Sequence, residues 1–468
     1  MAIAANETEP VDRKALDALR SRFNGALLQP EDEGFDVARR VWNGMVDKRP
    51  ALIARCTGVA DVQAAVRFGR EQGLLVSVKG GGHQVAGLAV ADGGLMIDLS
   101  LMRGVKVDPE ARTAKALGGC ILADVDRATQ VHGLATTLGV ISLTGIGGLT
   151  LGGGIGHLQG RHGFTVDNVL SIDLVTAEGD TLTVSADNEP DLFWGLRGGG
   201  GNFGIATAFE YRLHPVGPIV LAGPVAWPID QAPEVLRAVH DFMADPPDEA
   251  AALAALRLAP PAPFLPPDVF GKPICLVVLA YLGDPAAGAE ALAPVRAVGT
   301  PIVDAVRPCP YLFLQTMFDA GAPPGFNYYI KSNLLRDLPD EVIDLFVGHA
   351  QKITSPLSVV RLHWISGEAT RVDPASTATT GRDARVDVNF NSGWPPTAPD
   401  PGPHVAWARE GWEALQPHAG APMPQFLLDE DPAAVYGGTR LERLRALKDR
   451  WDPTNFFRLN QNVPPSSG

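Results

Sequence analysis

Three glycine-rich segments mark where this sequence can do chemistry: KGGGHQVAG at 79–87, TGIGGLTLGGGIG at 144–156 and RGGGGNFG at 197–204. Glycine has no Cβ and adopts positive φ at little cost, so the N–H groups of such loops can converge on an anion. Any one cluster is equally compatible with a flexible loop or a tight turn. Three clusters together favour a bound pyrophosphate, since ordering these loops costs roughly 1 kcal/mol per residue or more, which a ligand would offset.

Histidine is the reactive residue closest to these glycines. His83 directly follows Gly80, Gly81 and Gly82. Taken alone, a histidine after glycines is more often a loop residue than a cofactor ligand. His157 and His162 are five positions apart, off the i, i+4 spacing of helical zinc ligands, and no carboxylate or cysteine completes a set. We therefore expect no metal.

The elements around the clusters exclude two common nucleotide folds. Gly199, Gly201 and Gly204 match the dinucleotide fingerprint, but a helix-like segment precedes them and a strand-like segment follows, the reverse of the required order. No GxxxxGK[ST] segment is present either, so a P-loop is not supported.

The length of the chain and the distribution of its glycines and prolines predict two structural domains. A chain of 468 residues exceeds what one hydrophobic core usually supports. We expect a helical lead-in over 1–45 and β–α–β alternation over 46–215. From 216 to 422 the glycine loops vanish and proline accumulates, which indicates a second domain. Residues 423–468 contain the helical segment TRLERLRALKDRW, which stops at Asp452-Pro453.

Composition narrows the class of protein. The net charge is −14 and no basic stripe is visible, which argues against nucleic-acid binding. The N-terminus lacks a basic segment followed by an apolar one, and no stretch of about 18 apolar residues occurs, so we expect a cytoplasmic protein without a membrane anchor. The scattered cysteines, Cys56, Cys120, Cys275 and Cys309, are expected to be buried thiols rather than disulfides.

Four segments together resemble a known family. They are VSVKGGGHQVAGLAVADGGLMIDLS, LGVISLTGIGGLTLGGGIGHLQGRHGFTVDNVLSIDLVTAEG, DLFWGLRGGGGNFGI and DPTNFFRLNQNVPP. The chain resembles the FAD-linked oxidases of the vanillyl-alcohol oxidase type and, within them, the berberine bridge enzyme-like group. The resemblance implies an α+β fold: a two-part PCMH-type FAD-binding domain, made of 46–215 and the C-terminal segment, with an inserted α/β substrate domain whose antiparallel sheet is covered by helices.

The same resemblance assigns roles to the glycine loops. Residues 79–84 would wrap the pyrophosphate, 144–157 would line the flavin, 204–205 would contact adenosine or pyrophosphate, and 460–462 would return to the isoalloxazine. The cofactor contacts implied are Lys79, Gly80, Gly81, Gly82, His83, Gln84, Gly87, Leu143, Thr144, Gly145, Gly147, Gly148, Gly152, Gly153, Gly154, Gly156, His157, Gly204, Ile205, Asn460 and Asn462.

Covalent attachment of the flavin is a further implication. His83 stands where this family bonds the 8α-methyl of FAD to an imidazole nitrogen, although the sequence does not decide which nitrogen. Many relatives add a second bond from a cysteine. This chain has Ile141 in the corresponding segment, and an isoleucine offers no thiolate. We therefore expect one bond to FAD, through His83. Cys120, the nearest cysteine in sequence, is expected to be a core residue.

The catalytic base departs from the family pattern. Many relatives carry it as the last tyrosine of a Tyr-x-Asn-Tyr segment, where this chain has Met423-Pro424-Gln425-Phe426. Phe426 cannot accept a proton. The segment GFNYYIKSNLL resembles the family's strand facing the flavin, and in it Tyr329 and Lys331 share one face by strand alternation. We expect Lys331, Tyr329 and Gln425 as the catalytic candidates, although Lys331 is equally well a solvated strand-edge residue.

Residues 391 and 394 bear on the substrate pocket. Asn391 is a candidate pocket residue, whereas Trp394 is better explained as core packing. The predicted activity is hydride transfer from a CH–OH or CH–NH carbon of a small molecule to FAD, with dioxygen as acceptor and peroxide as product. By resemblance, Thr144 falls at a residue that gates oxygen access. A same-fold dehydrogenase and a noncatalytic flavin binder remain alternatives, and the sequence indicates neither the substrate nor the oligomeric state.

Overall fold

The computed structural model describes residues 12–420, 422–427 and 431–466 of the chain. Its N-terminal part begins with a four-stranded sheet in the order β1-β2-β4-β3, in which β2 and β3 both run parallel to β4. The elements here are α1 (Arg13–Arg20), β1 (Ala26–Leu28), α2 (Phe35–Ala38), β2 (Leu52–Arg55), α3 (Val59–Glu71), β3 (Val76–Lys79) and β4 (Leu95–Asp98). Because β1 pairs with β2, the expectation of a purely helical lead-in over 1–45 was wrong.

A second, five-stranded sheet follows in the order β5-β6-β10-β8-β9, all antiparallel. Its strands are β5 (Val105–Asp108), β6 (Thr113–Leu117), β8 (Val169–Val175), β9 (Thr181–Ser185) and β10 (Ile205–Arg212). A two-stranded ribbon joins β7 (Leu134–Ala135) to β11 (His214–Pro215). The intervening helices are α4 (Leu122–Gln130), α5 (Ile146–Leu151), α6 (Gln159–His162), η1 (Thr165–Asn168) and α7 (Pro190–Leu196).

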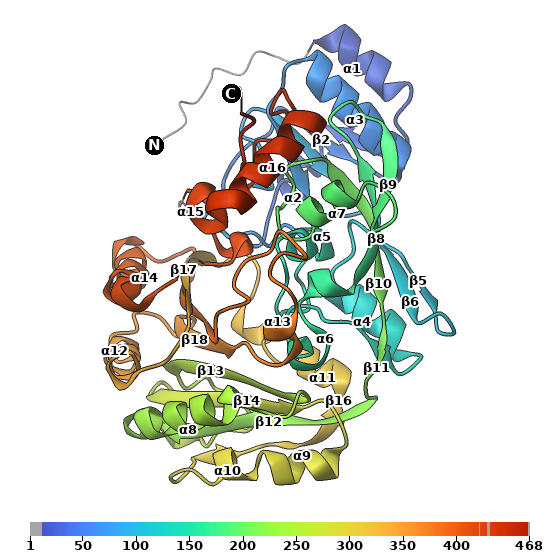
Figure 1. Ribbon diagram of the computed structural model, residues 1–468. Helices are drawn as coiled ribbons and strands as arrows, with labels where there is room; N and C mark the ends of the chain where they lie inside the picture. Colours follow the sequence, from blue (N-terminus) through green and yellow to red (C-terminus); the bar gives the residue numbers. More distant parts are fainter. Residues whose placement is uncertain (1–11, 421, 428–430, 467–468) are drawn as a thin grey trace.

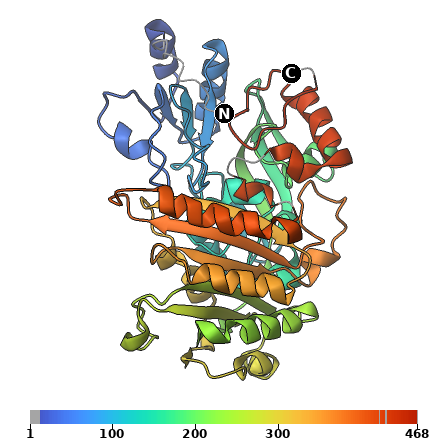
Figure 2. The ribbon, with the colours of Figure 1, turned by 90° about the vertical axis from the view of Figure 1, so that its left-hand side faces the viewer.

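The third sheet is eight-stranded and antiparallel, in the order β15-β12-β14-β13-β18-β19-β17, with β16 also paired to β12. Its strands are β12 (Ile219–Pro228), β13 (Ala250–Leu258), β14 (Pro273–Tyr281), β15 (Val303–Asp304), β16 (Arg307–Pro310), β17 (Asn327–Leu335), β18 (Val359–Trp364) and β19 (Val386–Trp394). The helices α8 (Ala232–Ala244), α12 (Asp340–Ala350) and α14 (Gly402–Leu415) lie side by side across one face of it (Figure 2). Shorter helices connect the strands: η2 (Ile229–Gln231), η3 (Pro267–Val269), α9 (Pro285–Ala291), α10 (Ala293–Arg296), α11 (Tyr311–Thr316), η4 (Asp319–Gly321), α13 (Glu368–Arg371) and η5 (Gln416–His418).

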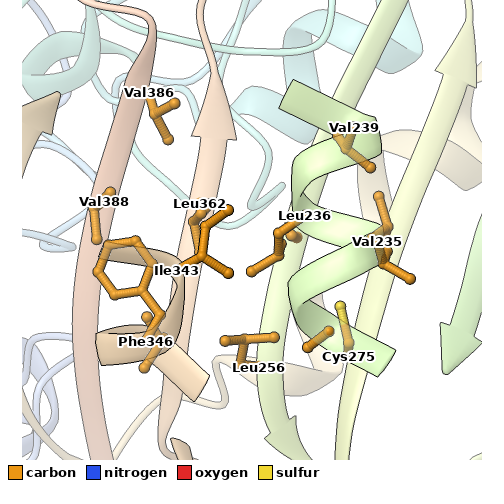
Figure 3. Close-up of a cluster of buried hydrophobic side chains, with 14 of the residues drawn as sticks. Val235, Leu236, Val239, Leu256, Cys275, Ile343, Phe346, Leu362, Val386 and Val388 are labelled. Carbon is orange, nitrogen blue, oxygen red and sulfur yellow. The ribbon is translucent and has the colours of Figure 1, made fainter. Parts of the chain in front are cut away.

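The helix-covered face of this sheet is apolar. Figure 3 shows Leu236 of α8 and Phe346 of α12 directed at Leu362 and Val388 of the strands. Val360, Leu362 and Trp364 of β18 all belong to this cluster, so the alternation of the strand sends Arg361 and His363 to the opposite face. The opposite face looks toward the first part of the chain, as the 6.4 Å between the ring centroids of His157 and His363 shows.

The C-terminal segment returns to the first part of the molecule. After η6 (Pro424–Phe426) and α15 (Pro432–Tyr436), the helix α16 (Gly438–Trp451) packs against α7 (Figure 1). Lys448 anchors it, because its fully buried ammonium group donates to the carbonyls of Asn202 and Phe457 and to the Asp452 carboxylate. The predicted α+β fold, with a helix-covered antiparallel sheet between two parts of a cofactor-binding unit, is confirmed.

The four cysteines are buried free thiols, as expected. No helix in the described ranges is both long and apolar enough to cross a bilayer. Among the same residues, no group of three or more His, Cys, Asp or Glu side chains is arranged to hold a metal ion.

Candidate functional site

Two of the glycine clusters meet backbone to backbone. A Cβ on Gly81 would lie 2.4 Å from the nitrogen of Gly145, and a Cβ on Gly145 would lie 2.3 Å from the nitrogen of Gly81. The second loop is fixed in place by Leu122, whose N–H donates to the carbonyl of Thr144 at 2.9 Å. Any side chain at either glycine would push the loops apart, so this contact requires glycine on both sides.

Other glycines of these clusters are not required by the protein's own packing. A Cβ on Gly148 or Gly201 would meet nothing within 4 Å, and neither residue has positive φ. Space therefore remains over the backbone at these two positions. A cofactor lying against the main chain would meet no side chain there, which is compatible with a dinucleotide such as FAD.

His83 lies next to this glycine contact and is partly buried. Its ring stacks on the indole of Trp42, with centroids 4.3 Å apart and planes inclined by 14°. Burial lowers the pKa of His83 to about 4, so the imidazole is neutral at pH 7. Its Nε2 atom is buried and has no hydrogen-bond partner in the described part of the chain.

The remaining predicted cofactor residues fall into three situations. The Lys79 ammonium group donates to the carbonyl of Ala38 at 2.8 Å, and the Gln84 amide donates to that of Leu427 at 3.0 Å, so both tie the loop to other segments. Leu143, in the second glycine loop region, is 39% exposed. Buried side-chain atoms without a partner in the described residues are His157 Nε2, Asn460 Oδ1 and Asn462 Oδ1.

The predicted glycines further along the chain shape the loops themselves. Gly82, Gly87, Gly153, Gly154 and Gly204 all have positive φ, the region that favours glycine, and Gly204 directly precedes β10, in which Ile205 is buried. The predicted residues Gly80, Gly147, Gly152 and Gly156 complete these loops without positive φ.

The face of the third sheet opposite the helices carries a buried polar cluster. Asp387 accepts hydrogen bonds from Arg361 at 2.6 Å, from Asn389 at 2.9 Å and from Ser332 at 3.2 Å. His363 sits directly across the strand pair from Asp387 and is 1% exposed. Burial, followed by the charge of Arg361, holds the pKa of His363 well below its usual value. Neither ring nitrogen of His363 has a hydrogen-bond partner within the described residues.

The predicted catalytic residues on β17 point the other way. Tyr329 and Lys331 do share a face, but it is the face under α14. The Tyr329 hydroxyl accepts from Arg409 Nε at 2.7 Å, and the Lys331 ammonium group lies 4.8 Å above the Trp412 ring. The expectation that this pair faces the flavin was therefore wrong, and so was the alternative of a solvated edge, since Lys331 is buried. Because Tyr328 and Tyr329 are adjacent, the sequence does not decide which of the two sheet faces each tyrosine occupies.

The tyrosine that does face the cofactor loops is Tyr328. Its ring stacks on Trp42 with centroids 3.8 Å apart, and its hydroxyl donates to the carbonyl of Pro323 at 2.7 Å. Burial raises the pKa of this phenol further above its usual value, which removes it as a proton acceptor near neutral pH.

The other residues singled out in the sequence lie in η6, in the hydrophobic cores or on the polar face of the third sheet. Gln425 lies in η6, and its side chain falls outside the described residues. Phe426 lies under the Arg361 guanidinium, 5.4 Å from it to the ring centroid. Trp394 is a core residue, as expected, and so is Cys120. Asn391 lies on the same sheet face as His363, with its Oδ1 atom buried and without a partner in the described residues.

Two groups of residues were missed by the sequence reasoning. The polar alternation Arg361, His363 on β18 and Asp387, Asn389 on β19 is a regular period-two pattern and could have been found. Trp42 carries no such signal, because it lies outside helices and strands and reaches His83 only through the tertiary fold.

Comparison with known proteins places this geometry in a family. Residues 50–185 match the family model described as FAD binding domain, and residues 426–464 match the one described as berberine and berberine like. The (R)-6-hydroxynicotine oxidase of Paenarthrobacter nicotinovorans is 31% identical over 461 residues, covering 95% of this chain and 97% of that protein. An FAD-linked oxidoreductase of Dictyostelium discoideum is 30% identical over 431 residues, covering 91% of each.

Solved structures agree with these matches. The crystal structure of 6-hydroxy-D-nicotine oxidase from Arthrobacter nicotinovorans has a TM-score of 0.85 at 29% identity and covers 95% of this chain and 98% of that one. Glucooligosaccharide oxidase from Acremonium strictum shares the fold, with a TM-score of 0.84 at 24% identity and coverage of 96% and 99%. The fold and the glycine loops thus define an FAD-linked oxidoreductase. The chain belongs to the berberine bridge enzyme-like group of FAD-linked oxidases.

Proposed function

We propose that this protein is an FAD-dependent oxidase of a small molecule, with its flavin bonded to His83. The bound flavin would supply a hydride acceptor and a route for the electrons to dioxygen, with peroxide as product. One observation carries the proposal: His83 and His157, which follow the first two glycine runs, and His363, whose ring centroid lies 6.4 Å from that of His157, each have a buried nitrogen without a hydrogen-bond partner in the described residues. Buried polar atoms without partners are rare in folded proteins unless a ligand meets them.

The residues that would hold FAD are those around the two touching loops. The backbone at Gly148 would receive the pyrophosphate, because a Cβ there would meet nothing within 4 Å, while Gly81 and Gly145 hold the two loops together. Asn460 and Asn462 would offer their unpartnered carbonyl oxygens to the isoalloxazine side. The exposed side chain of Leu143 would be covered by the bound cofactor.

The proton acceptor we propose is His363, replacing the β17 residues. Its ring is neutral, so the lone pair of one nitrogen can accept a proton or a hydrogen bond from the substrate. Asp387 fits this role less well, because Arg361, Asn389 and Ser332 already occupy its oxygens. Those same donors hold Asp387 directly across the strands from His363 and leave the imidazole edge for the substrate.

The substrate class we propose to test first is a cyclic amine, then aromatic alcohols and sugars. The order follows a relative that matches along nearly the whole chain and is named a 6-hydroxynicotine oxidase, while the oligosaccharide oxidase is similar in fold only. An amine that is already neutral needs no base, whereas an alcohol does. Dioxygen as acceptor is supported by the small side chain of Thr144 at the position that resembles the oxygen gate.

Anaerobic mixing of the purified protein with each compound tests the proposal. A true substrate bleaches the flavin absorbance, and admission of air restores it with one peroxide per turnover. Bleaching that air does not reverse would indicate a dehydrogenase with another acceptor. Absence of bleaching by every compound would favour a noncatalytic flavin binder.

A further inference from the structure

The segment Trp42–Asn43–Gly44 joins three parts of the chain that are far apart in sequence. The N–H of Trp42 donates to the carbonyl of Gly82 at 2.9 Å, which fixes the indole beside the histidine loop. Its carbonyl accepts from Gly325 at 2.9 Å, and its indole N–H donates to the carbonyl of Ala322 at 2.9 Å. These last two bonds anchor the segment to the loop that leads into β17.

Asn43 completes the junction with its side chain. Its amide group donates to the carbonyls of Val85 at 2.8 Å and Tyr328 at 2.9 Å, and its side-chain oxygen accepts from the N–H of Tyr328 at 2.9 Å. Asn43 is 3% exposed, so these bonds are shielded from water. The position of the indole is thereby set by both the first part of the chain and the third sheet.

The indole in turn sets the plane of His83. The rings of His83 and Tyr328 both stack on Trp42, and each is inclined to it by 14°. A stacked contact uses the face of the imidazole and leaves its edge, with the Nε2 atom, open to a ligand. The unpartnered Nε2 atom shows that no other described side chain fixes the ring by a hydrogen bond there.

We propose that Trp42 is the positioning residue for covalent flavin attachment: its indole holds the His83 imidazole in the plane in which a ring nitrogen meets the 8α-methyl carbon of FAD. The inference rests on the attachment proposed above. In that reaction a nitrogen–carbon bond replaces one methyl C–H bond and the imidazole N–H bond. Two of the four electrons of the broken bonds form the new nitrogen–carbon bond. The other two electrons and the two protons would reduce the flavin, and dioxygen would then take them up as peroxide.

Loss of the indole should slow attachment without removing the site for FAD. An imidazole free to rotate reaches the reactive geometry rarely, and misplacement of about 1 Å can cost about 10²-fold in rate. The test uses the full-length protein and measures the fraction of its flavin that stays with the chain after acid denaturation. Wild type should retain its flavin and His83→Ala should release it all. Trp42→Phe should attach flavin at nearly the rate of wild type. Leucine is similar in bulk to phenylalanine but has no flat ring, so Trp42→Leu should attach flavin about ten- to a hundredfold more slowly.

Visible spectra of the native proteins show whether each variant still binds FAD, which separates attachment from binding. Tyr328→Phe is the matched control, because it keeps the stack and loses only the hydroxyl bond to Pro323; it should attach flavin like wild type. Equal rates of attachment in Trp42→Leu and Trp42→Phe would overturn the inference while leaving the proposed attachment intact. A wild-type protein that releases all its flavin in acid would contradict the attachment at His83 itself, and the inference with it.

Discussion

The two faces of β18 and β19 differ completely, although the same strands make both. Toward the helices they present Val360, Leu362, Val386 and Val388, packed against α8 and α12 (Figure 3). On the opposite face they present polar residues: Arg361 and Asn389, both hydrogen-bonded to Asp387, together with His363 and Asn391. Strand alternation lets one face supply the stability of the sheet while the other holds polar groups. The two faces should therefore respond differently to substitution.

The largest effect is expected at His363, on the polar face. His363→Leu removes the proposed proton acceptor and should slow flavin reduction by an alcohol substrate about 10²–10⁴-fold, the usual range for loss of a general base. Stability should not fall, because an apolar side chain replaces a buried imidazole that lacks a partner. Rapid-mixing absorbance and urea unfolding measure the two quantities. A variant that is less stable but equally fast would place His363 among the structural residues.

Phe346, on the apolar face, should show the opposite response. The side chain is fully buried between α12 and the strands, so Phe346→Ala should lower the free energy of unfolding by about 3–5 kcal/mol. Flavin reduction measured well below the midpoint of thermal unfolding should stay within about twofold of wild type. A tenfold slower reduction in the folded variant would mean that the helix layer acts on the site, and the division between the faces would not hold.

Acid should destabilise the folded protein through His157, whose ring lies beside that of His363. Burial lowers the pKa of His157 from 6.5 to about 4, so the folded protein binds fewer protons than the unfolded chain between these values. The contribution of His157 to the free energy of unfolding is therefore fully present above pH 6.5 and is lost as the pH drops toward 4. At 1.36 kcal/mol per pKa unit, this loss amounts to about 3 kcal/mol.

Urea unfolding of wild type and His157→Gln at pH 7, 5.5 and 4 measures this dependence, since glutamine does not titrate. The variant should lose less stability over the range. Identical pH slopes for wild type and His157→Gln would contradict the assignment.

The smallest effect is expected at Lys331. Because its ammonium group lies under α14, Lys331→Met should slow flavin reduction less than tenfold at any pH. Steady-state and rapid-mixing rates across pH 6–10 check this. A large loss in the rate of flavin reduction, with a pH dependence that shows a titrating group, would assign the catalytic base to β17 and not to His363.

The sequence predicted the fold better than the site. Glycine runs at 79–87 and 144–156, together with the returning NQN segment, specify the cofactor-binding part through local chemistry and resemblance. The strand phase at Tyr328 and Tyr329 could not be predicted, because apolar or aromatic residues occupy both faces of β17 and only packing against Trp42 or α14 decides between them. Trp42 itself depends on contacts more than 280 positions away in sequence, such as that with Tyr328, and no local pattern encodes these.

The four buried thiols have a consequence for how long such a protein keeps working. An oxidase releases an oxidant next to its own chain with every turnover, and the thiolate is the form of cysteine that this oxidant attacks. Burial raises the pKa of Cys275 to about 12 and raises the pKa of Cys56, Cys120 and Cys309 as well. Hardly any thiolate is present at neutral pH, so the four cysteines should resist oxidation by the proposed product through many catalytic cycles in air.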